Sequence, residues 1–336
     1  MTTRACSVRT MGSAGLALGV DGGGTKTDAV VCDTSGTVRG FGSAGRGNWE
    51  YDGIEGATAS LAEAVAMALA QAGAIASQID SSVFALAGLD WPVDEDRLAP
   101  VVAELGLGGT TLLVNDAFAA LRAGCRHEHG VVSIAGTGTV TAGRNRLGRT
   151  FRTMAIGYGE RGGGSDLVRE ALDAIARTRH GQAPPTLLEE RFLTALGLPT
   201  NDALFEAITR RGLEISSELA PLVLGAAADD DPAAVVIAHE MGDGLAHAVV
   251  GVARTLEMQD DIFEVICAGG VHVAGSVPLE AAFRETLSSS CPAAVPVTLA
   301  APPAIGAAIL ALEQLVAVDV ALHDRLLGGV ASSILA

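Results

Sequence analysis

The chain has 336 residues, of which 49% are hydrophobic, so it is long enough for two domains of ordinary size with separate apolar cores. A formal net charge of −17 argues against nucleic acid as a partner, and no apolar run approaches the roughly 18 residues of a membrane span. The five cysteines are odd in number and contain no CxxC pair, which argues against a disulfide framework or a zinc knuckle and favours a reducing cytoplasm.

The N-terminal part of the chain predicts a tail, a strand and a phosphate-binding turn. Residues 1–15 lack the apolar segment of a secretory signal, and we expect a disordered tail there. An apolar strand follows and ends in VDGGGTKT, residues 20–27. A Walker loop requires GK[ST] followed by a helix, whereas the segment after TKT turns like a β-hairpin. A Walker loop is therefore excluded. Taken alone, the segment has an ordinary glycine-rich hairpin as its alternative interpretation. The residues expected to hold phosphate are Gly22, Gly23, Gly24, Thr25 and Lys26.

Two further elements precede residue 125. Residues 54–73 place Leu61, Val65 and Ala68 on one stripe, which predicts an amphipathic helix that covers the first sheet. The segment 110–124, TTLLVNDAFAALRAG, predicts a buried apolar strand that ends at Asp116 and leads into an alanine-rich helix. A helix cap is the alternative role for this aspartate.

The second half repeats the strand–turn–strand pattern. VVSIAGTGTVTAG, residues 131–143, has a Gly-Thr-Gly turn, and two such turns indicate two related halves. An amphipathic helix capped by Ser165 is predicted next, followed by short helices and by a long helix from about Ala233 to Leu256. EVICAGGVHVAG, residues 264–275, predicts a strand that ends in two glycines, and residues 303–314 predict a helix of small residues.

Three polar clusters are weak metal candidates. His239, Asp243 and His247 share one face of the predicted long helix, but the polar stripe of an amphipathic helix explains the same spacing. We interpret RHEH at 126–129 as a solvated loop and the aspartates at 229–231 as a cap for the helix after them.

The succession of elements resembles the actin, hexokinase and Hsp70-like ATPase superfamily, in which two phosphate loops, an adenosine loop and two connecting helices follow this order. Further segments resemble the branch that contains N-acetylglucosamine kinase and the benzoyl-CoA reductase type ATPases. They are GRGNWEYDG, FALAGLD, the pair Asn115 and Asp116, SIAGTG and PAIGAAILAL. The chain departs from that branch at 157–165, where it reads GYGERGGGS instead of a Gly-Asp-Glu-Gly-Ser stretch.

The resemblance implies an α/β fold of two actin-like (ribonuclease H-like) domains. Each would be a mixed sheet flanked by helices, with the active site in the cleft between the domains. We expect the domains at 16–122 and 123–314, and a helix in 315–336 that packs back on the first domain. A homodimer is a further expectation.

The same resemblance implies transfer of phosphate from ATP to an amino sugar, most simply N-acetylglucosamine to its 6-phosphate. Alternatives are a glucosamine kinase, an ATPase that activates a reductase or dehydratase, and a non-catalytic sugar sensor. Asp116 would be the base, and Asp21 would hold Mg²⁺ through water. The second phosphate loop, Gly136, Thr137 and Gly138, and the adenosine loop, Gly269 and Gly270, would complete the ATP site. The expected sugar contacts are Asp116, Asn48, Asp90 and Glu160, with Asn48 as a simple turn asparagine being the alternative. The glycines at 162–164 should leave room in the sugar pocket.

Overall fold

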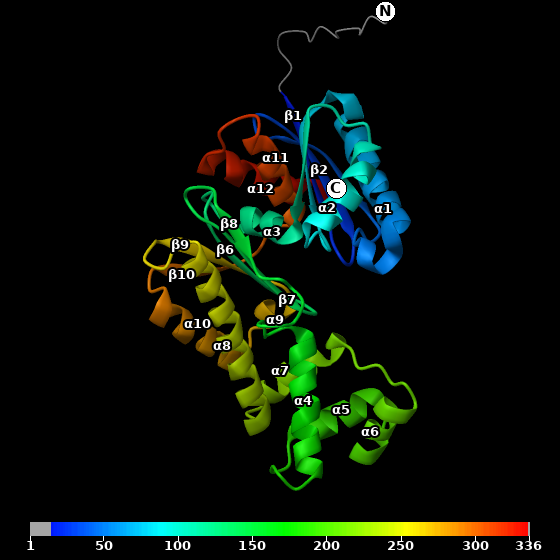
Figure 1. Ribbon diagram of the computed structural model, residues 1–336, viewed down its shortest axis with the longest axis vertical. Helices are drawn as coiled ribbons and strands as arrows, with labels where there is room; N and C mark the ends of the chain where they lie inside the picture. Colours follow the sequence, from blue (N-terminus) through cyan, green and yellow to red (C-terminus); the bar gives the residue numbers. More distant parts are fainter. Residues whose placement is uncertain (1–14, 335–336) are drawn as a thin grey trace, which may run out of the picture. The chain divides into compact units, whose positions relative to one another are not determined.

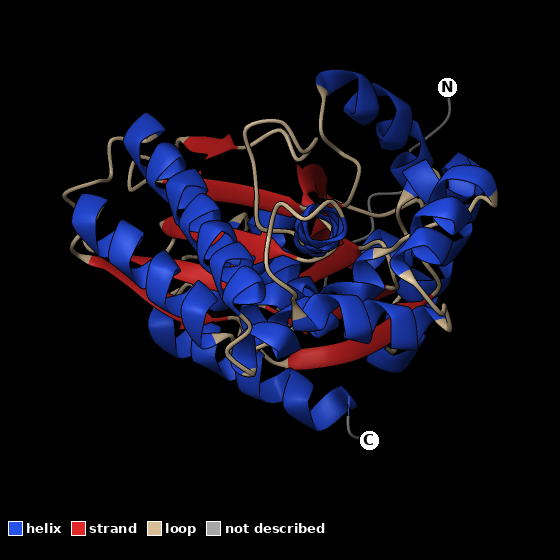
Figure 2. Ribbon diagram, turned by 90° about the horizontal axis from the view of Figure 1, so that it is seen from below, coloured by secondary structure: helices blue, strands red, loops and turns tan. Residues whose placement is uncertain are grey.

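The computed structural model describes residues 15–334 and contains two compact units (Figure 1). The first unit consists of residues up to Arg126 together with those from Ala301 onward, and the second is His127–Ala300. Each unit contains one five-stranded mixed sheet, with helices packed along its strands (Figure 2). This confirms the predicted fold class. The predicted tail lies outside the described residues, except for Gly15.

The sheet of the first unit has the strand order β3-β2-β1-β4-β5. Strands β1 to β3 are antiparallel, whereas β4 and β5 run parallel to β1. The strands are β1 (Leu16–Gly22), β2 (Thr27–Asp33), β3 (Val38–Ala44), β4 (Ile79–Leu86) and β5 (Thr110–Asn115). The helices are α1 (Trp49–Ala72), α2 (Pro92–Ala103), α3 (Asp116–Gly124), α11 (Pro303–Glu313) and α12 (Val320–Ile334), with a 3₁₀ turn, η1 (Ala76–Gln78).

Strand alternation gives this sheet two cores. Successive side chains of a strand point to opposite faces, so Leu18 and Val20 pack with α1 and α2, while Ala17 packs with α3, α11 and α12. The stripe predicted for residues 54–73 is buried, as expected. Strand β5 differs from its prediction, because it lies at the edge of the sheet and alternate side chains, including Leu112, are exposed.

The second unit has the strand order β10-β9-β6-β7-β8. Its strands are β6 (Gly130–Ala135), β7 (Thr139–Arg144), β8 (Thr150–Arg152), β9 (Phe263–Ala268) and β10 (Ala294–Thr298). Its helices are α4 (Gly164–Arg179), α5 (Leu187–Leu196), α6 (Asn201–Arg210), α7 (Ala220–Ala228), α8 (Pro232–Thr255), α9 (Gly270–Val273) and α10 (Val277–Ser290), with a 3₁₀ turn, η2 (Ser217–Leu219). The apolar faces of α4, α7, α8 and α10 meet in one core with β6 and β9.

Helix α11 packs within the first unit, although residues 303–314 were expected in the second domain. Its small residues permit backbone contact: a β-carbon at Gly306 would overlap with the Ala119 carbonyl oxygen, and one at Gly19 would overlap with the backbone at Ala308. The helix therefore fits tightly between β1 and α3. The following helix, α12, packs against β3 of the same unit.

Helix α8 is long and apolar enough to cross a membrane by length and composition alone, although polar residues interrupt its apolar runs. Half of its most apolar window is buried, and the helix packs closely against α10. A core helix passes the same test, and the packing gives α8 that role.

Candidate functional site

Three segments that are far apart in the sequence meet at the carboxyl edge of the first sheet. The parallel register aligns Gly22 with Leu86, and Leu86 with Asn115, so β1, β4 and β5 end side by side. The segments that follow β3 and β4 are joined to the end of β1 and its turn through the backbone, because the amides of Gly47 and Ala87 donate to the carbonyls of Gly23 and Gly22 at 3.0 Å. The candidate residues of the first unit therefore share one edge.

Asp21 lies at this edge among other carboxylates. Burial is the largest cause that raises the pKa of Asp21, and the negative charges of Asp116 and Asp28 add to it; although Lys26 opposes the shift, the pKa rises to about 8. Asp28 stands directly opposite Asp21 in the β1–β2 pair. Sequence reasoning missed Asp28, although the symmetry of the hairpin about its turn places the two residues together.

Carboxylate oxygens of this kind suit a hard divalent cation, which would relieve the mutual repulsion. Within residues 15–334, however, three or more His, Cys, Asp or Glu side chains do not gather as a metal-binding group. A Mg²⁺ ion held here would therefore use Asp21 together with water and phosphate oxygens, as Mg²⁺ commonly does.

The first glycine-rich turn uses some of its donors internally. The Gly23 amide donates to the Lys26 carbonyl at 3.0 Å, and Lys26 Nζ lies 2.6 Å from Asp28 Oδ2. Because the Gly23 carbonyl accepts from Gly47 and a trans peptide directs N–H and C=O oppositely, the Gly24 amide points away from Gly47. Gly24 and Thr25 are exposed. We expect these two amides, rather than that of Gly23, to face an anion.

Asn115, not Asp116, caps helix α3. The Asn115 Oδ1 accepts from the Ala117 amide at 3.1 Å, and its Nδ2 donates to Asp90 Oδ1 at 3.0 Å. The capping alternative for Asp116 is therefore wrong. Asp116 occupies the first helical position, half-buried at the strand edge.

Asn48 and Asp90 lie near one another through the segment 84–90. Asn48 is buried and caps α1, since its Oδ1 accepts from the Glu50 amide at 2.9 Å. A β-carbon at Gly88 would lie 3.0 Å from Asn48 Oδ1, and Trp49 Nε1 donates to the Gly88 carbonyl at 2.8 Å. The segments GRGNW, FALAGLD and ND thus form one cluster. Within it, Asn48 has a local structural role as the cap of α1.

In the second unit, the turn Gly136–Gly138 directs two amides away from α4. The Gly164 and Ser165 amides donate to the carbonyls of Gly136 and Thr137 at 2.8 and 2.9 Å. Since a trans peptide directs its N–H opposite to its C=O, the amides of Thr137 and Gly138 point away from the helix. β-Carbons at Gly136 and Gly138 would meet no atom within 4 Å. Two neighbouring amides that point away from the helix, beside open space at both glycines, suit a phosphate group.

The glycines at 162–164 do not leave room, contrary to the expectation. A β-carbon at Gly163 would lie 2.8 Å from Gly138, one at Gly164 would lie 3.0 Å from Ser217 Cβ, and Gly162 faces Leu245. Neighbouring atoms fill the space, and the glycines permit close packing of α4 on the turn. The predicted cap is also wrong: Gly163 takes the cap position, and Asp166 Oδ2 accepts from the Gly162 and Gly163 amides.

Glu160 lies buried below the exposed loop 154–159. Its Oε1 accepts from the Ala155 amide at 2.9 Å, whereas its buried Oε2 has no hydrogen-bond partner. Such an oxygen is costly unless a ligand or water satisfies it. Arg161 points elsewhere, since its guanidinium lies 2.9 Å from Glu170 Oε1.

The predicted adenosine loop, Gly269 and Gly270, lies directly against the predicted second phosphate turn. Gly269 has φ 89°, and a β-carbon there would overlap with the Ala135 carbonyl, whereas one at Gly270 would meet nothing within 4 Å. Only glycine satisfies the first position. The second is open enough for a flat ligand to approach the backbone.

The weak metal candidates have structural roles. His247 Nδ1 lies 3.2 Å from Asp243 Oδ1, which also accepts from Thr286 Oγ1 at 2.6 Å. Asp231 caps α8 and accepts from the Leu187 amide, so it joins two helices. Residues 126–129 form an irregular turn.

Comparison with known proteins finds relatives that match nearly their full length. The chain is 29% identical over 302 residues to an N-acetylmuramic acid/N-acetylglucosamine kinase of Clostridium acetobutylicum, a match that covers 88% of this chain and 98% of that protein. It is 25% identical over 313 residues to an N-acetyl-D-glucosamine kinase of Dictyostelium discoideum, with the same two coverages. A crystal structure of a candidate N-acetylglucosamine kinase from Chromobacterium violaceum superimposes with a TM-score of 0.67 at 23% identity, over 88% of this chain and 99% of the other.

The two five-stranded mixed sheets and their connections define the fold of the actin-like ATPases and sugar kinases. Within that class, the model of the BadF/BadG/BcrA/BcrD ATPase family matches residues 18–311. The chain belongs to this family, as the sequence motifs predicted.

Proposed function

We propose that this protein is an ATP-dependent kinase that phosphorylates a hydroxyl of an amino sugar, with N-acetylglucosamine as the favoured substrate. Membership of an ATPase family supports the use of ATP, and two relatives with nearly full coverage are named as kinases of N-acetylated sugars. The 6-hydroxyl as acceptor and a cytoplasmic location complete the proposal. A homodimer remains an expectation.

The observation that carries this proposal is the pair of carboxylates at the edge of the first sheet. Asp116 directly follows Asn115, which belongs to the polar cluster with Asn48 and Asp90. The negative charge of Asp116 also raises the pKa of Asp21. A sugar hydroxyl is a weak nucleophile and needs a positioned base. Phosphoryl transfer also needs a cation and donors that neutralise the phosphate oxygens.

The residues take distinct roles in this proposal. Asp116 accepts the proton of the attacking hydroxyl, and Asp21 holds Mg²⁺, which offsets charge on the phosphates when bound. The amides of Gly24 and Thr25 donate to the transferred phosphoryl group, and those of Thr137 and Gly138 donate to the other phosphates. The open backbone at Gly270 lies against adenosine.

The sugar contacts are assigned to Asn48, Asp90 and Glu160. Nδ2 of Asn48 is only weakly engaged, at 3.5 Å from Glu50 Oε2, so it can turn to a sugar hydroxyl while Oδ1 caps α1. The unsatisfied Oε2 of Glu160 would accept from a hydroxyl or an amide N–H. The names of the two relatives favour the acetylated sugar over glucosamine.

A coupled ADP-release assay across hexoses, glucosamine, N-acetylglucosamine and N-acetylmuramic acid tests the proposal. We expect N-acetylglucosamine to exceed glucose in kcat/KM by at least about 10-fold, with ADP formed in step with sugar phosphate. ADP release that ignores every sugar would favour an activating ATPase. Sugar binding without turnover would leave a sensor.

A further inference from the structure

One side-chain hydrogen bond joins the adenosine loop to the strand that leads into the second phosphate turn. His272 Nε2 lies 3.0 Å from Ser133 Oγ. Ser133 is fully buried on β6, which ends at Ala135, and His272 lies in α9, two residues after Gly270. The bond therefore spans the two glycine loops that the proposed function assigns to ATP.

The spacing of these loops leaves little tolerance. The backbone of Gly269 packs directly on the Ala135 carbonyl and on the Gly136 amide. This contact limits how closely the loops approach. The parallel pairing of β6 with β9 joins the two strands as far as Ile134 and Ala268, where the loops begin. Beyond that pairing, the His272–Ser133 hydrogen bond supplies a further attachment, from the helix after the adenosine loop back to β6.

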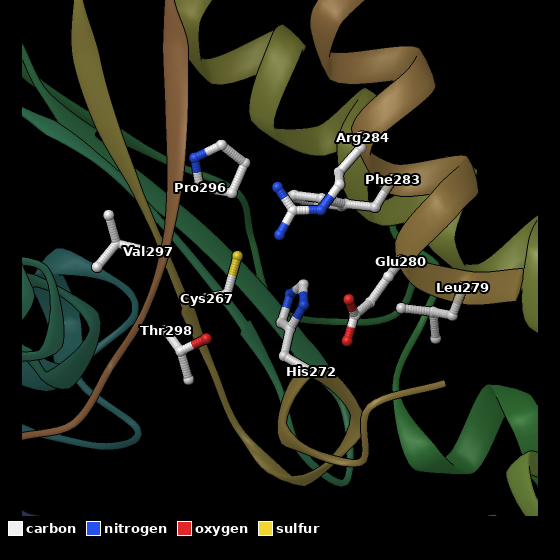
Figure 3. A pocket seen from close by; sticks show the side chains of 9 residues that line it. All are labelled: Cys267, His272, Leu279, Glu280, Phe283, Arg284, Pro296, Val297 and Thr298. Atoms are coloured by element: carbon white, nitrogen blue, oxygen red, sulfur yellow. The ribbon is translucent and has the colours of Figure 1, made fainter. Parts of the chain in front are cut away.

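The surroundings of His272 leave its ring dependent on that bond. The side chain points into a small cavity of about 60 Å³, lined also by Cys267, Glu280 and Arg284 (Figure 3). The Phe283 ring meets it edge-on, with centroids 5.3 Å apart. A cavity of this size is large enough to admit water, so packing does not fix the ring on this side. Burial lowers the pKa of His272 to about 4, and the neutral imidazole shares one hydrogen bond with the hydroxyl.

We propose that His272 is a positioning residue for the nucleotide: by binding Ser133, it holds Gly269 and Gly270 at the distance from Gly136–Gly138 that ATP requires. This proposal rests on the proposed function, because it takes both loops as parts of the ATP site. It concerns binding of the nucleotide and leaves sugar binding unaffected.

Three variants separate the hydrogen bond from general packing. His272→Leu keeps most of the side-chain volume and removes the bond, and Ser133→Ala removes the same bond from its other end. His272→Gln places an amide group where Nε2 lies and restores the bond. His247→Leu, at an exposed histidine of the same unit, is the matched control.

Calorimetric titration with ADP and Mg²⁺, and separately with N-acetylglucosamine, gives the readout. We expect Kd for ADP to rise about 3- to 10-fold in His272→Leu and Ser133→Ala, consistent with one lost hydrogen bond. The double variant should be no weaker than the weaker single variant, because both remove one interaction. His272→Gln and His247→Leu should bind ADP within about 2-fold of the wild type, and Kd for the sugar should stay constant throughout.

Two outcomes would overturn the inference alone: wild-type ADP affinity in both bond-deleting variants, or a parallel loss of sugar affinity, which would mean that His272 only stabilises the fold. A wild-type protein that binds no ADP would instead refute the assignment of the glycine loops, and the proposed function and the inference would fall together.

Discussion

At the scale of single residues, Asp21 carries an electrostatic cost in the absence of ligand. Its half-buried carboxylate lies near Asp116 and Asp28, and the Lys26 ammonium offsets the repulsion only in part, since Lys26 is exposed and pairs with Asp28. Charged groups in such positions commonly serve binding or catalysis at the expense of stability. Asp21 is therefore a site where the two requirements conflict.

Asp21→Asn should make this conflict visible. We expect turnover to fall by at least about 10²-fold, because the amide holds a cation poorly, while the melting temperature of the ligand-free protein rises by at least about 2 °C. Thermal unfolding and the coupled assay measure the two effects. A lower melting temperature together with normal turnover would contradict both expectations.

Asp116→Asn should separate catalysis from binding. The substitution keeps the shape of the side chain and removes the proton acceptor, so kcat should fall by about 10²-fold or more while ADP affinity changes less than about 2-fold. Asp96→Asn, at an exposed aspartate of α2, is the control and should be neutral. Turnover near the wild-type value would remove Asp116 from the role of base.

His272 predicts a particular dependence of stability on pH. Its pKa is lowered in the folded protein, so its contribution to stability is fully present above the unfolded pKa of about 6.5 and is lost as pH falls toward 4. Arg284 and Glu280 face it across the cavity and act in opposite directions on a charged ring. Melting temperatures of the wild type and His272→Gln between pH 7 and pH 4.5 should therefore converge or cross as pH falls.

At the scale of elements, the sequence predicts where strands and turns lie better than how they pack. The glycines of VDGGGTKT and SIAGTG have a conformational signature that is local, and both hairpins follow the prediction. The run Gly162–Gly164 carries the same signature for another reason, namely close contact with Gly138 and Leu245. Contacts between distant segments leave no trace in local spacing, so the spacing alone predicts open space where the structure has close contacts.

Capping residues show the same limit. Asn115 and Asp116 are adjacent and both suit a helix start, and Ser165 is a favourable cap by type. Tertiary contacts decide each case: Asn115 also reaches Asp90, and α4 already begins at Gly164, where the first two helical amides donate to the carbonyls of Gly136 and Thr137. The residue type predicts that a helix begins nearby, but not which of two neighbours caps it.

Gly163→Ala tests the packing of α4 on the second phosphate turn. The new methyl group would lie 2.8 Å from Gly138 and from the Thr137 carbonyl, so the turn must shift. We expect a loss of about 1–3 kcal/mol in stability and weaker ADP binding. Gly251→Ala, at an open position inside α8, should instead be neutral or stabilising by up to about 1 kcal/mol. Equal behaviour of the two variants in both assays would contradict this role for Gly163.

At the scale of the whole molecule, the chain passes between the two units twice, after Arg126 and before Ala301. The helices next to these passages, α3 and α11, are fastened to each other in the first unit, since Arg122 Nε lies 2.6 Å from Glu313 Oε1 in a buried pair. We expect any relative motion of the units to occur in the short connecting segments rather than in these helices.

Closure of the two units around both ligands is expected, because phosphoryl transfer must exclude water as a competing acceptor. Small-angle scattering should give a smaller radius of gyration with ADP, Mg²⁺ and sugar together than without ligands. Sugar alone provides the comparison. Identical profiles in all three conditions would count against closure.

The placement of α11 and α12 in the first unit has a consequence for biosynthesis. The apolar face of the first sheet that includes Ala17, Val30 and Val83 is covered by side chains from residues 304–326. Those residues emerge from the ribosome only after the whole second unit has been made. The sheet synthesised first is thus completed last, and one of its faces stays uncovered while the second unit is translated. During that interval, the nascent chain exposes an apolar surface, and chaperones would compete with other unfinished chains to bind it.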